Sequence, residues 1–119
     1  MKQIVVIDDE IDFCVLVKMQ CSKKDINCVY ATSLDAGIEL VQKVDPSVVI
    51  LDNNLPDGLG WQKARQILQS HPHTVLHLIT AKTTNDKTVK KMNGKEDETD
   101  RIFYHVKPLS LYEIEEILL

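Results

Sequence analysis

The sequence predicts an α/β fold in which helices cover both faces of a parallel five-stranded sheet. Short apolar or β-branched runs alternate with segments of helical periodicity along the whole 119-residue chain. This strand–helix alternation, five times over, is typical of parallel sheets with right-handed crossovers. No repeat, linker or low-complexity stretch interrupts it, and the length fits one domain.

Five strands are expected where runs rich in Val, Ile, Leu or Tyr end at polar or turn-forming residues. They cover residues 3–7, 28–31, 48–51, 75–79 and 102–106. The third run is apolar throughout, which is typical of a strand buried on both faces. Asn-Asn-Leu-Pro-Asp-Gly follows Asp52 and indicates a turn. Asp52 is therefore expected at the carboxyl end of a central strand, facing an open crevice.

Helical spacing of apolar residues predicts five helices. They cover residues 11–23, 34–44, about 58–70, about 86–92 and 110–119. Thr32 or Ser33 can cap the second helix, and Ser110 with Glu113 forms a capping-box pattern at the start of the last. The buried stripe predicted for the second helix consists of Ala36, Leu40 and Val41.

Composition excludes several classes of partner. The net charge is −4, whereas recognition of a phosphate backbone needs clustered Lys and Arg, so we expect no direct nucleic-acid contact by this domain. No apolar run approaches the ~20 residues that span a bilayer, and no signal peptide is evident. We therefore expect a cytoplasmic domain without membrane contact. Cys14, Cys21 and Cys28 lack a CxxC pair and are interpreted as reduced core residues rather than zinc ligands.

Polar side chains stand at the carboxyl ends of four of the five expected strands. Asp8 and Asp9 follow the first, Asp52 the third, Thr80 the fourth and Lys107 the fifth. In a parallel sheet these ends share one rim, where ligands bind. A hard cation such as Mg²⁺ relieves the repulsion between carboxylates. With an ammonium and a hydroxyl beside them, the group predicts a phosphoryl site in which an Asp is the nucleophile.

The histidines offer a second candidate metal site. His71 and His73 lie in an expected loop, and His77 lies within an expected strand. We interpret all three as solvated or core histidines.

Four motifs in this order resemble a response-regulator receiver domain, and the resemblance covers the whole chain. They are Ile7-Asp8-Asp9-Glu10, Leu51-Asp52 with Leu55-Pro56-Asp57-Gly58-Leu59-Gly60, Thr80-Ala81, and Tyr104-His105-Val106-Lys107-Pro108. The resemblance implies a flavodoxin-like (βα)5 doubly wound sheet with strand order 2-1-3-4-5. It also implies that residues 1–119 are the N-terminal part of a longer regulator whose output domain lies outside this chain.

The resemblance assigns Asp52 as the phospho-acceptor. It implies Mg²⁺ as the cofactor, for which Mn²⁺ or Ca²⁺ can substitute. The implied metal ligands are Asp9, Asp52 and the backbone carbonyl of Asn54, with Asp8 acting through water.

Thr80 and Lys107 would hold the phosphoryl oxygens, helped by backbone N–H groups near Asn53 and Ala81. Thr80 would also act with Tyr104, the switch aromatic, to change the face formed by the last strand and the helices beside it. The same face is the implied surface for a homodimer. The bond between Lys107 and Pro108 is expected to be a cis peptide.

One segment departs from the family pattern. Residues 90–100 replace the usual Ala- and Gly-containing segment with strongly polar sequence. We therefore expect the helix near 86–92 to be irregular and residues 83–100 to be mobile. The two positions that tune dephosphorylation in the family are Asn54 and Lys82 here.

Three functions compete. The first is a phospho-accepting switch in two-component signalling, supplied by a sensor histidine kinase or phosphotransfer protein and controlling an output such as transcription. Such a domain is not an enzyme on other substrates, because it catalyses only its own phosphorylation and dephosphorylation. The second is a haloacid-dehalogenase-type phosphatase, but Asn54 stands where its second acid is needed. The third is a degenerate receiver that acts as a phosphorylation-independent interaction module.

Overall fold

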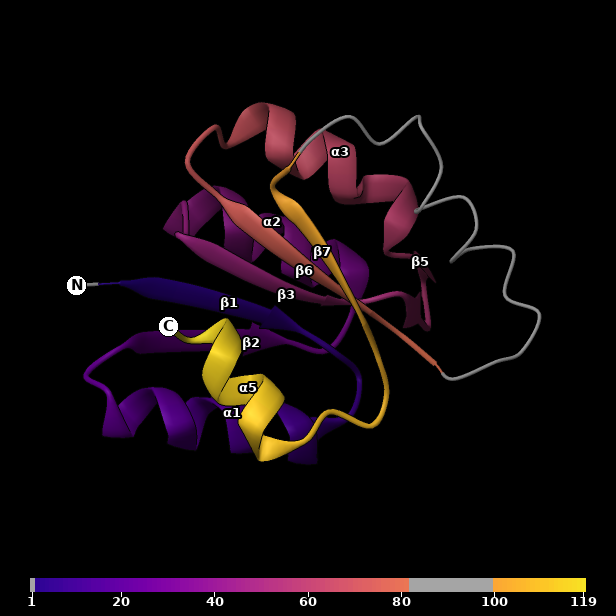
Figure 1. Ribbon diagram of the computed structural model, residues 1–119. Helices are drawn as coiled ribbons and strands as arrows, with labels where there is room; N and C mark the ends of the chain where they lie inside the picture. Colours follow the sequence, from indigo (N-terminus) through magenta and orange to yellow (C-terminus); the bar gives the residue numbers. More distant parts are fainter. Residues whose placement is uncertain (1, 82–99) are drawn as a thin grey trace.

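The main sheet has the order β2-β1-β3-β6-β7, and all neighbouring strands run parallel. The computed structural model describes residues 2–81 and 100–119 (Figure 1). The strands are β1 (Gln3–Ile7), β2 (Asn27–Ala31), β3 (Val48–Asp52), β6 (Val75–Thr80) and β7 (Ile102–Val106). Because β6 and β7 are the fourth and fifth strands of this sheet along the chain, the predicted 2-1-3-4-5 order is confirmed.

Helices cover both faces of the sheet, as predicted. They are α1 (Ile11–Lys23), α2 (Leu34–Val44), α3 (Trp61–Ser70) and α5 (Leu111–Ile117). Helices α1 and α5 lie on one side of the sheet, and α2 and α3 lie on the other (Figure 1). Alternate strand residues supply the two cores: Val49 and Leu51 join the α2/α3 side, whereas Val48 and Ile50 join the α1/α5 side.

Three strands are one residue longer than predicted because parallel pairing continues past the apolar run. Asp52 pairs with Ile79 at the end of β3, and Thr80 pairs with Val106 at the end of β6. Strand β2 starts at Asn27, which pairs with β1. Asp52 and Thr80 are thus held by strand backbone rather than by loops.

Helix α3 begins at Trp61 and not near residue 58, so the predicted start is wrong. Asn54–Leu55 (β4) and Gly58–Leu59 (β5) form an antiparallel hairpin before it. Asn53 then fixes the first helical turn, because its Oδ1 accepts from the Trp61 N–H at 3.0 Å. A two-residue pairing of this kind leaves no periodic pattern in the sequence.

Helix α2 has two caps at its N-terminus. Ser33 Oγ accepts from the Ala36 N–H at 3.2 Å, so Ser33 is the capping residue of the two candidates. The Asp57 carboxylate accepts from the N–H groups of Leu34 at 2.8 Å and Asp35 at 2.9 Å. These bonds lower the pKa of Asp57. The hairpin that follows Asp52 is thereby tied to α2.

The buried stripe predicted for α2 is wrong at one position. Ala36 is exposed, Leu40 is half-buried, and Val41 is buried as expected. Gly37 occupies the position that faces the sheet. A Cβ there would lie 2.6 Å from the Ile7 side chain, so α2 packs on β1 at a distance that only glycine allows.

Helix α5 begins at the predicted capping box. Ser110 Oγ accepts from the Glu113 N–H at 3.1 Å, and Glu113 Oε1 accepts from the Ser110 N–H at 3.0 Å. The helix ends at Ile117 and does not continue to the last residue as expected. The helix expected at 86–92 and the mobility expected from residue 83 onward fall on residues 82–99, which lie outside the described residues.

Cys14, Cys21 and Cys28 are free and buried, as predicted. Within residues 2–81 and 100–119, helices are too short or too polar to cross a membrane.

Candidate functional site

The carboxyl ends of the parallel strands bring the predicted residues together. Asp8 directly follows β1, Asp52 ends β3, and Lys107 directly follows β7. Lys107 Nζ lies 3.4 Å from Asp8 Oδ2 and 3.5 Å from Asp52 Oδ2. Carboxylate oxygens of Asp8, Asp9 and Asp52 all lie within 4.8 Å of one another. One cation and three carboxylates therefore share this rim of the sheet.

Burial controls the charge state of the acids. Desolvation, followed by the charge of Asp8, raises the pKa of Asp52 to about 6, although Lys107 opposes this. Desolvation also raises the pKa of Asp8, against the backbone N–H of Glu10 that donates to its Oδ1 at 2.8 Å. These carboxylates bind protons more tightly than exposed acids because they are desolvated and lie close to other negative charges.

Lys107 responds in the opposite direction. Burial alone lowers the pKa of Lys107, but its bond to Glu10 and the charges of Asp52 and Asp8 outweigh this and hold the pKa above its usual range. Lys107 is therefore positively charged at neutral pH.

Two polar atoms at the site lack hydrogen-bond partners within the described part of the chain. They are Asp8 Oδ2 and Thr80 Oγ1, and both are buried. Buried polar groups are normally satisfied, so these two atoms indicate room for a ligand. An acceptor oxygen within a carboxylate cluster fits a hard divalent cation, and a hydroxyl donor fits an anionic oxygen.

The predicted open crevice at Asp52 is wrong. Asp52 is 3% exposed, whereas Asp9 is exposed. Asp52 Oδ1 accepts from the Asn54 N–H at 3.3 Å, and Asp52 Oδ2 faces Lys107. The Asn53 N–H, named as a helper of the phosphoryl oxygens, donates to the Ile79 carbonyl at 2.8 Å.

The predicted switch residues occupy neighbouring strands. Thr80 is buried at the end of β6, and Tyr104 of β7 is half-buried against the α2/α3 core. Tyr104 pairs in register with Leu78, two residues before Thr80. The Lys107–Pro108 peptide is cis. Ala81 is exposed, and Lys82 lies outside the described residues.

Glu10 is a member of this group that sequence reasoning missed. Its Oε1 lies 2.5 Å from Lys107 Nζ, closer than either Asp8 or Asp52. The only signal was its position directly after Asp8-Asp9. Because Glu10 is exposed, it links the half-buried ammonium of Lys107 to the surface.

The candidate histidine site is not assembled from the three predicted residues. His71 is buried and bonds Asp45 through Nδ1 at 2.7 Å, and His73 is exposed. His77 contacts His105 instead.

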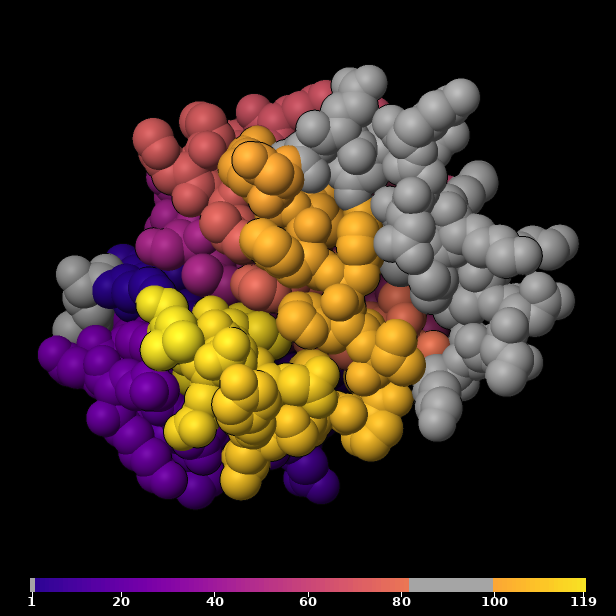
Figure 2. Space-filling view, in the orientation of Figure 1, coloured from indigo at the N-terminus to yellow at the C-terminus, as the bar shows by residue number. Residues whose placement is uncertain are grey.

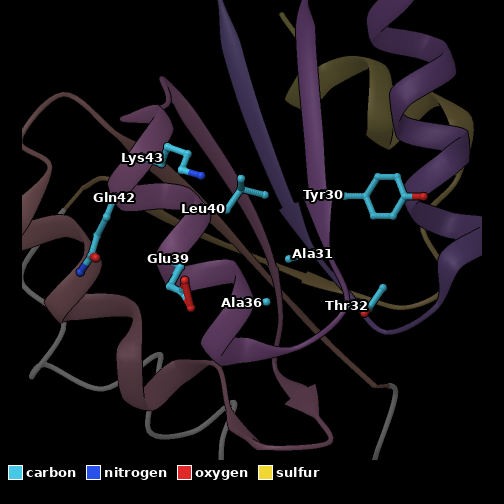
Figure 3. A pocket seen from close by; sticks show the side chains of 8 residues that line it. All are labelled: Tyr30, Ala31, Thr32, Ala36, Glu39, Leu40, Gln42 and Lys43. Carbon is cyan, nitrogen blue, oxygen red and sulfur yellow. The ribbon is translucent and has the colours of Figure 1, made fainter.

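A groove of about 790 Å³ lies at the β2 edge of the sheet, beside α2. Glu39 and Lys43 of α2 line it together with Tyr30 and Ala31 of β2, and the Tyr30 ring points away from α2 (Figure 3). The groove shares no residue with the carboxylate cluster, so it is a separate feature.

Known proteins resemble this chain in sequence and fold. Transcriptional regulatory protein TrcR of Mycobacterium tuberculosis is 30% identical over 112 residues, which cover 94% of this chain and 42% of that protein. The curated relatives are longer than this chain. The matched region spans 45% of transcriptional regulatory protein YxdJ of Bacillus subtilis, 42% of TrcR and 20% of response regulator protein PilR of Pseudomonas aeruginosa.

Solved structures show the same fold. A receiver domain protein of Methanospirillum hungatei has a TM-score of 0.81 at 18% identity, with 99% of this chain and 90% of that chain covered. A response regulator protein of Burkholderia pseudomallei has a TM-score of 0.80 at 18% identity, with 100% and 67% covered.

The family model described as the response regulator receiver domain matches residues 4–117. This match covers nearly the whole chain, including every strand of the main sheet except the first residue of β1. The chain therefore belongs to the response regulator receiver domain family of two-component signalling.

Proposed function

We propose that this domain accepts a phosphoryl group on Asp52 from a sensor histidine kinase or phosphotransfer protein, in a Mg²⁺-dependent reaction. The observation that carries the proposal is the convergence of Lys107 on Asp52 and Asp8, beside the buried Thr80 hydroxyl that has no partner among the described residues. This arrangement pairs a nucleophilic carboxylate with donors for an incoming anion.

In the proposed step an Asp52 carboxylate oxygen forms a bond to phosphorus while the bond from phosphorus to the donor histidine nitrogen breaks. The electron pair of that bond leaves with the nitrogen, and an acyl phosphate forms. With a pKa of about 6, Asp52 is ionised at neutral pH and can attack. The Lys107 ammonium and the Thr80 hydroxyl then hold the phosphoryl oxygens.

Asp9, Asp52 and the Asn54 carbonyl would hold the Mg²⁺ directly, and Asp8 would act through water. When bound, the ion neutralises the carboxylates and screens the charge of the phosphoryl group. The clustered carboxylate oxygens support this assignment, as does Asp8 Oδ2, which has the Lys107 ammonium nearby but no hydrogen bond among the described residues. The Burkholderia pseudomallei relative contains a phosphorylated aspartic acid together with a calcium ion.

The signal would leave through the face formed by β7 and α5. A phosphoryl group that draws Thr80 toward Asp52 would change the packing around Tyr104 on the adjacent strand. The segments that contain β7 and α5 lie side by side at the surface (Figure 2). Both carry exposed apolar side chains. They are Phe103, Val106, Leu111 and Tyr112. This surface would bind a second copy or an output module.

The wider assignment follows the relatives. TrcR and YxdJ are named transcriptional regulatory proteins and are more than twice as long as the matched region. We infer that this domain is the N-terminal part of a cytoplasmic regulator whose output module contacts DNA while this domain does not. The domain itself would act only on its own phosphorylation and dephosphorylation.

The test is phosphorylation by acetyl phosphate with and without Mg²⁺, read by intact-protein mass spectrometry. Wild type should gain one phosphoryl group only when Mg²⁺ is present, and Asp52→Asn should gain none. Asp57→Asn is the matched control, because Asp57 caps α2 outside the site, and it should still be modified. Absence of any gain in wild type would leave the phosphorylation-independent interaction module as the function.

A further inference from the structure

His77 of β6 and His105 of β7 form a contact pair away from the carboxylate cluster. His77 Nδ1 lies 2.9 Å from His105 Nε2, and the ring centroids are 5.1 Å apart. Leu78 belongs to the α2/α3 core and Ile79 to the α1/α5 core. Because strand side chains alternate, the two odd-numbered histidines lie on the α1/α5 side of the sheet.

The surroundings keep both imidazoles neutral. Burial, followed by the charge of His105, lowers the pKa of His77 to about 4. Burial also lowers the pKa of His105, against the raising effect of Glu113. Phe103 stacks on the His77 ring with centroids 5.3 Å apart. Neutral imidazole is the form that binds metal ions, so neither ring has to release a proton to solvent at neutral pH.

We propose that His77 and His105 form a bidentate binding site for a divalent transition-metal ion of the Ni²⁺, Cu²⁺ or Zn²⁺ class. Imidazole nitrogen suits these ions, whereas Mg²⁺ prefers oxygen. With metal–nitrogen distances of about 2.0–2.1 Å, two nitrogens 2.9 Å apart subtend about 90° at the ion. That is the angle between adjacent ligands in the tetragonal geometry of Cu²⁺ and Ni²⁺.

Binding requires a small rearrangement of the pair. In the hydrogen-bonded pair, one ring donates its N–H to the lone pair of the other. On binding, both rings turn so that their lone pairs point at the ion, and the donating ring moves its proton to its other nitrogen. The proton count of the protein does not change, and water completes the ligand shell.

Glu113 adds charge to this site without serving as a ligand. Its Oε1 accepts from the Ser110 N–H in the capping box at the start of α5. Its carboxylate is near enough to act on the pKa of His105, and a negative potential there favours a cation. The site thus has two nitrogen ligands and one neighbouring negative charge.

Titration calorimetry with NiCl₂ on the untagged full chain tests the proposal. Excess Mg²⁺ is included to occupy the carboxylate oxygens. One Ni²⁺ should bind per chain, and His77→Gln and His105→Gln should each weaken binding by at least roughly tenfold, since even outer partners of metal ligands are worth about 10–100-fold. The control His73→Gln changes an exposed histidine and should bind like wild type.

A second measurement does not depend on the variants being folded. The electron paramagnetic resonance spectrum of wild type with one equivalent of Cu²⁺ should show coupling to two imidazole nitrogens. A spectrum with oxygen ligands only, or equal Ni²⁺ affinity in folded His77→Gln and wild type, would overturn the proposal. Asp52→Asn should bind Ni²⁺ as wild type does, which separates this site from the proposed phosphorylation.

Discussion

Lys107 Nζ lies 3.5 Å from Asp52 Oδ2, although the two residues are 55 positions apart in the sequence and come from non-adjacent strands. The same ammonium contacts Asp8 and Glu10. Lys107 therefore counterbalances a buried group of acids that repel one another. The stability of the domain and its readiness for phosphorylation depend on the same electrostatic arrangement.

Asp52→Asn should stabilise the metal-free protein at neutral pH. The Asp52 pKa of about 6, against 3.8 ordinarily, means that its ionised form costs about 1–3 kcal/mol of folding free energy. Between these two pH values the folded state holds the extra proton, so this residue makes stability fall as pH rises. Urea unfolding measured at several pH values in this window should show that the free energy of unfolding falls less steeply with pH for Asp52→Asn than for wild type.

Added Mg²⁺ should make wild type more stable than Asp52→Asn, because an ion bound at the carboxylates stabilises the folded wild type. Glu39→Gln removes an exposed carboxylate from α2 and controls for the loss of net charge. If Asp52→Asn and Glu39→Gln change the free energy of unfolding equally, Asp52 is not electrostatically strained.

Lys107→Met should destabilise the protein at neutral pH by about 1–3 kcal/mol, because buried carboxylates lose their counter-charge. The pKa of Asp52 should rise further, and phosphorylation by acetyl phosphate should slow. The loss of stability should shrink at low pH as the acids become protonated. Chemical denaturation at several pH values measures this, with Lys43→Met, an exposed lysine of α2, as the control. A loss independent of pH would contradict the electrostatic explanation.

Gly60→Ala should damage the site through the backbone. A Cβ at this position would lie 2.7 Å from the Asp52 carbonyl oxygen and 3.0 Å from Leu51 Cγ. We expect a loss of about 1–3 kcal/mol in the free energy of unfolding and slower phosphorylation, because Asp52 has to shift. Gln62→Ala, on the exposed side of α3, should leave both unchanged. Normal phosphorylation of Gly60→Ala would show that the close approach is unimportant for the acceptor.

Arg101→Met should weaken the C-terminal end of α3. The Arg101 guanidinium donates to the carbonyls of His71 at 3.0 Å, Thr74 at 2.8 Å and Leu68 at 3.0 Å. Losing these bonds should cost about 2–3 kcal/mol and speed amide exchange at this helix end, while phosphorylation persists. Arg65→Met, on the exposed side of α3, is the control, and equal protection in both variants would refute the anchoring role.

Local sequence was enough to predict most of the fold. Apolar runs and helical spacing placed every strand of the main sheet to within one residue, because burial on both faces leaves a continuous apolar run. Parallel topology alone places Asp8, Asp52, Thr80 and Lys107 at one rim, since all four stand at strand ends. The receiver motifs then identified the family without any knowledge of distances.

The sequence by itself thus determined the order of elements and which residues share the rim. Tertiary structure alone decided how those residues are solvated and which others join them. Asp52 is buried, and Glu10 reaches Lys107 across 97 positions. His77 and His105 meet only because of the register between β6 and β7. Such contacts depend on packing distance and strand register, which periodicity along one segment does not encode.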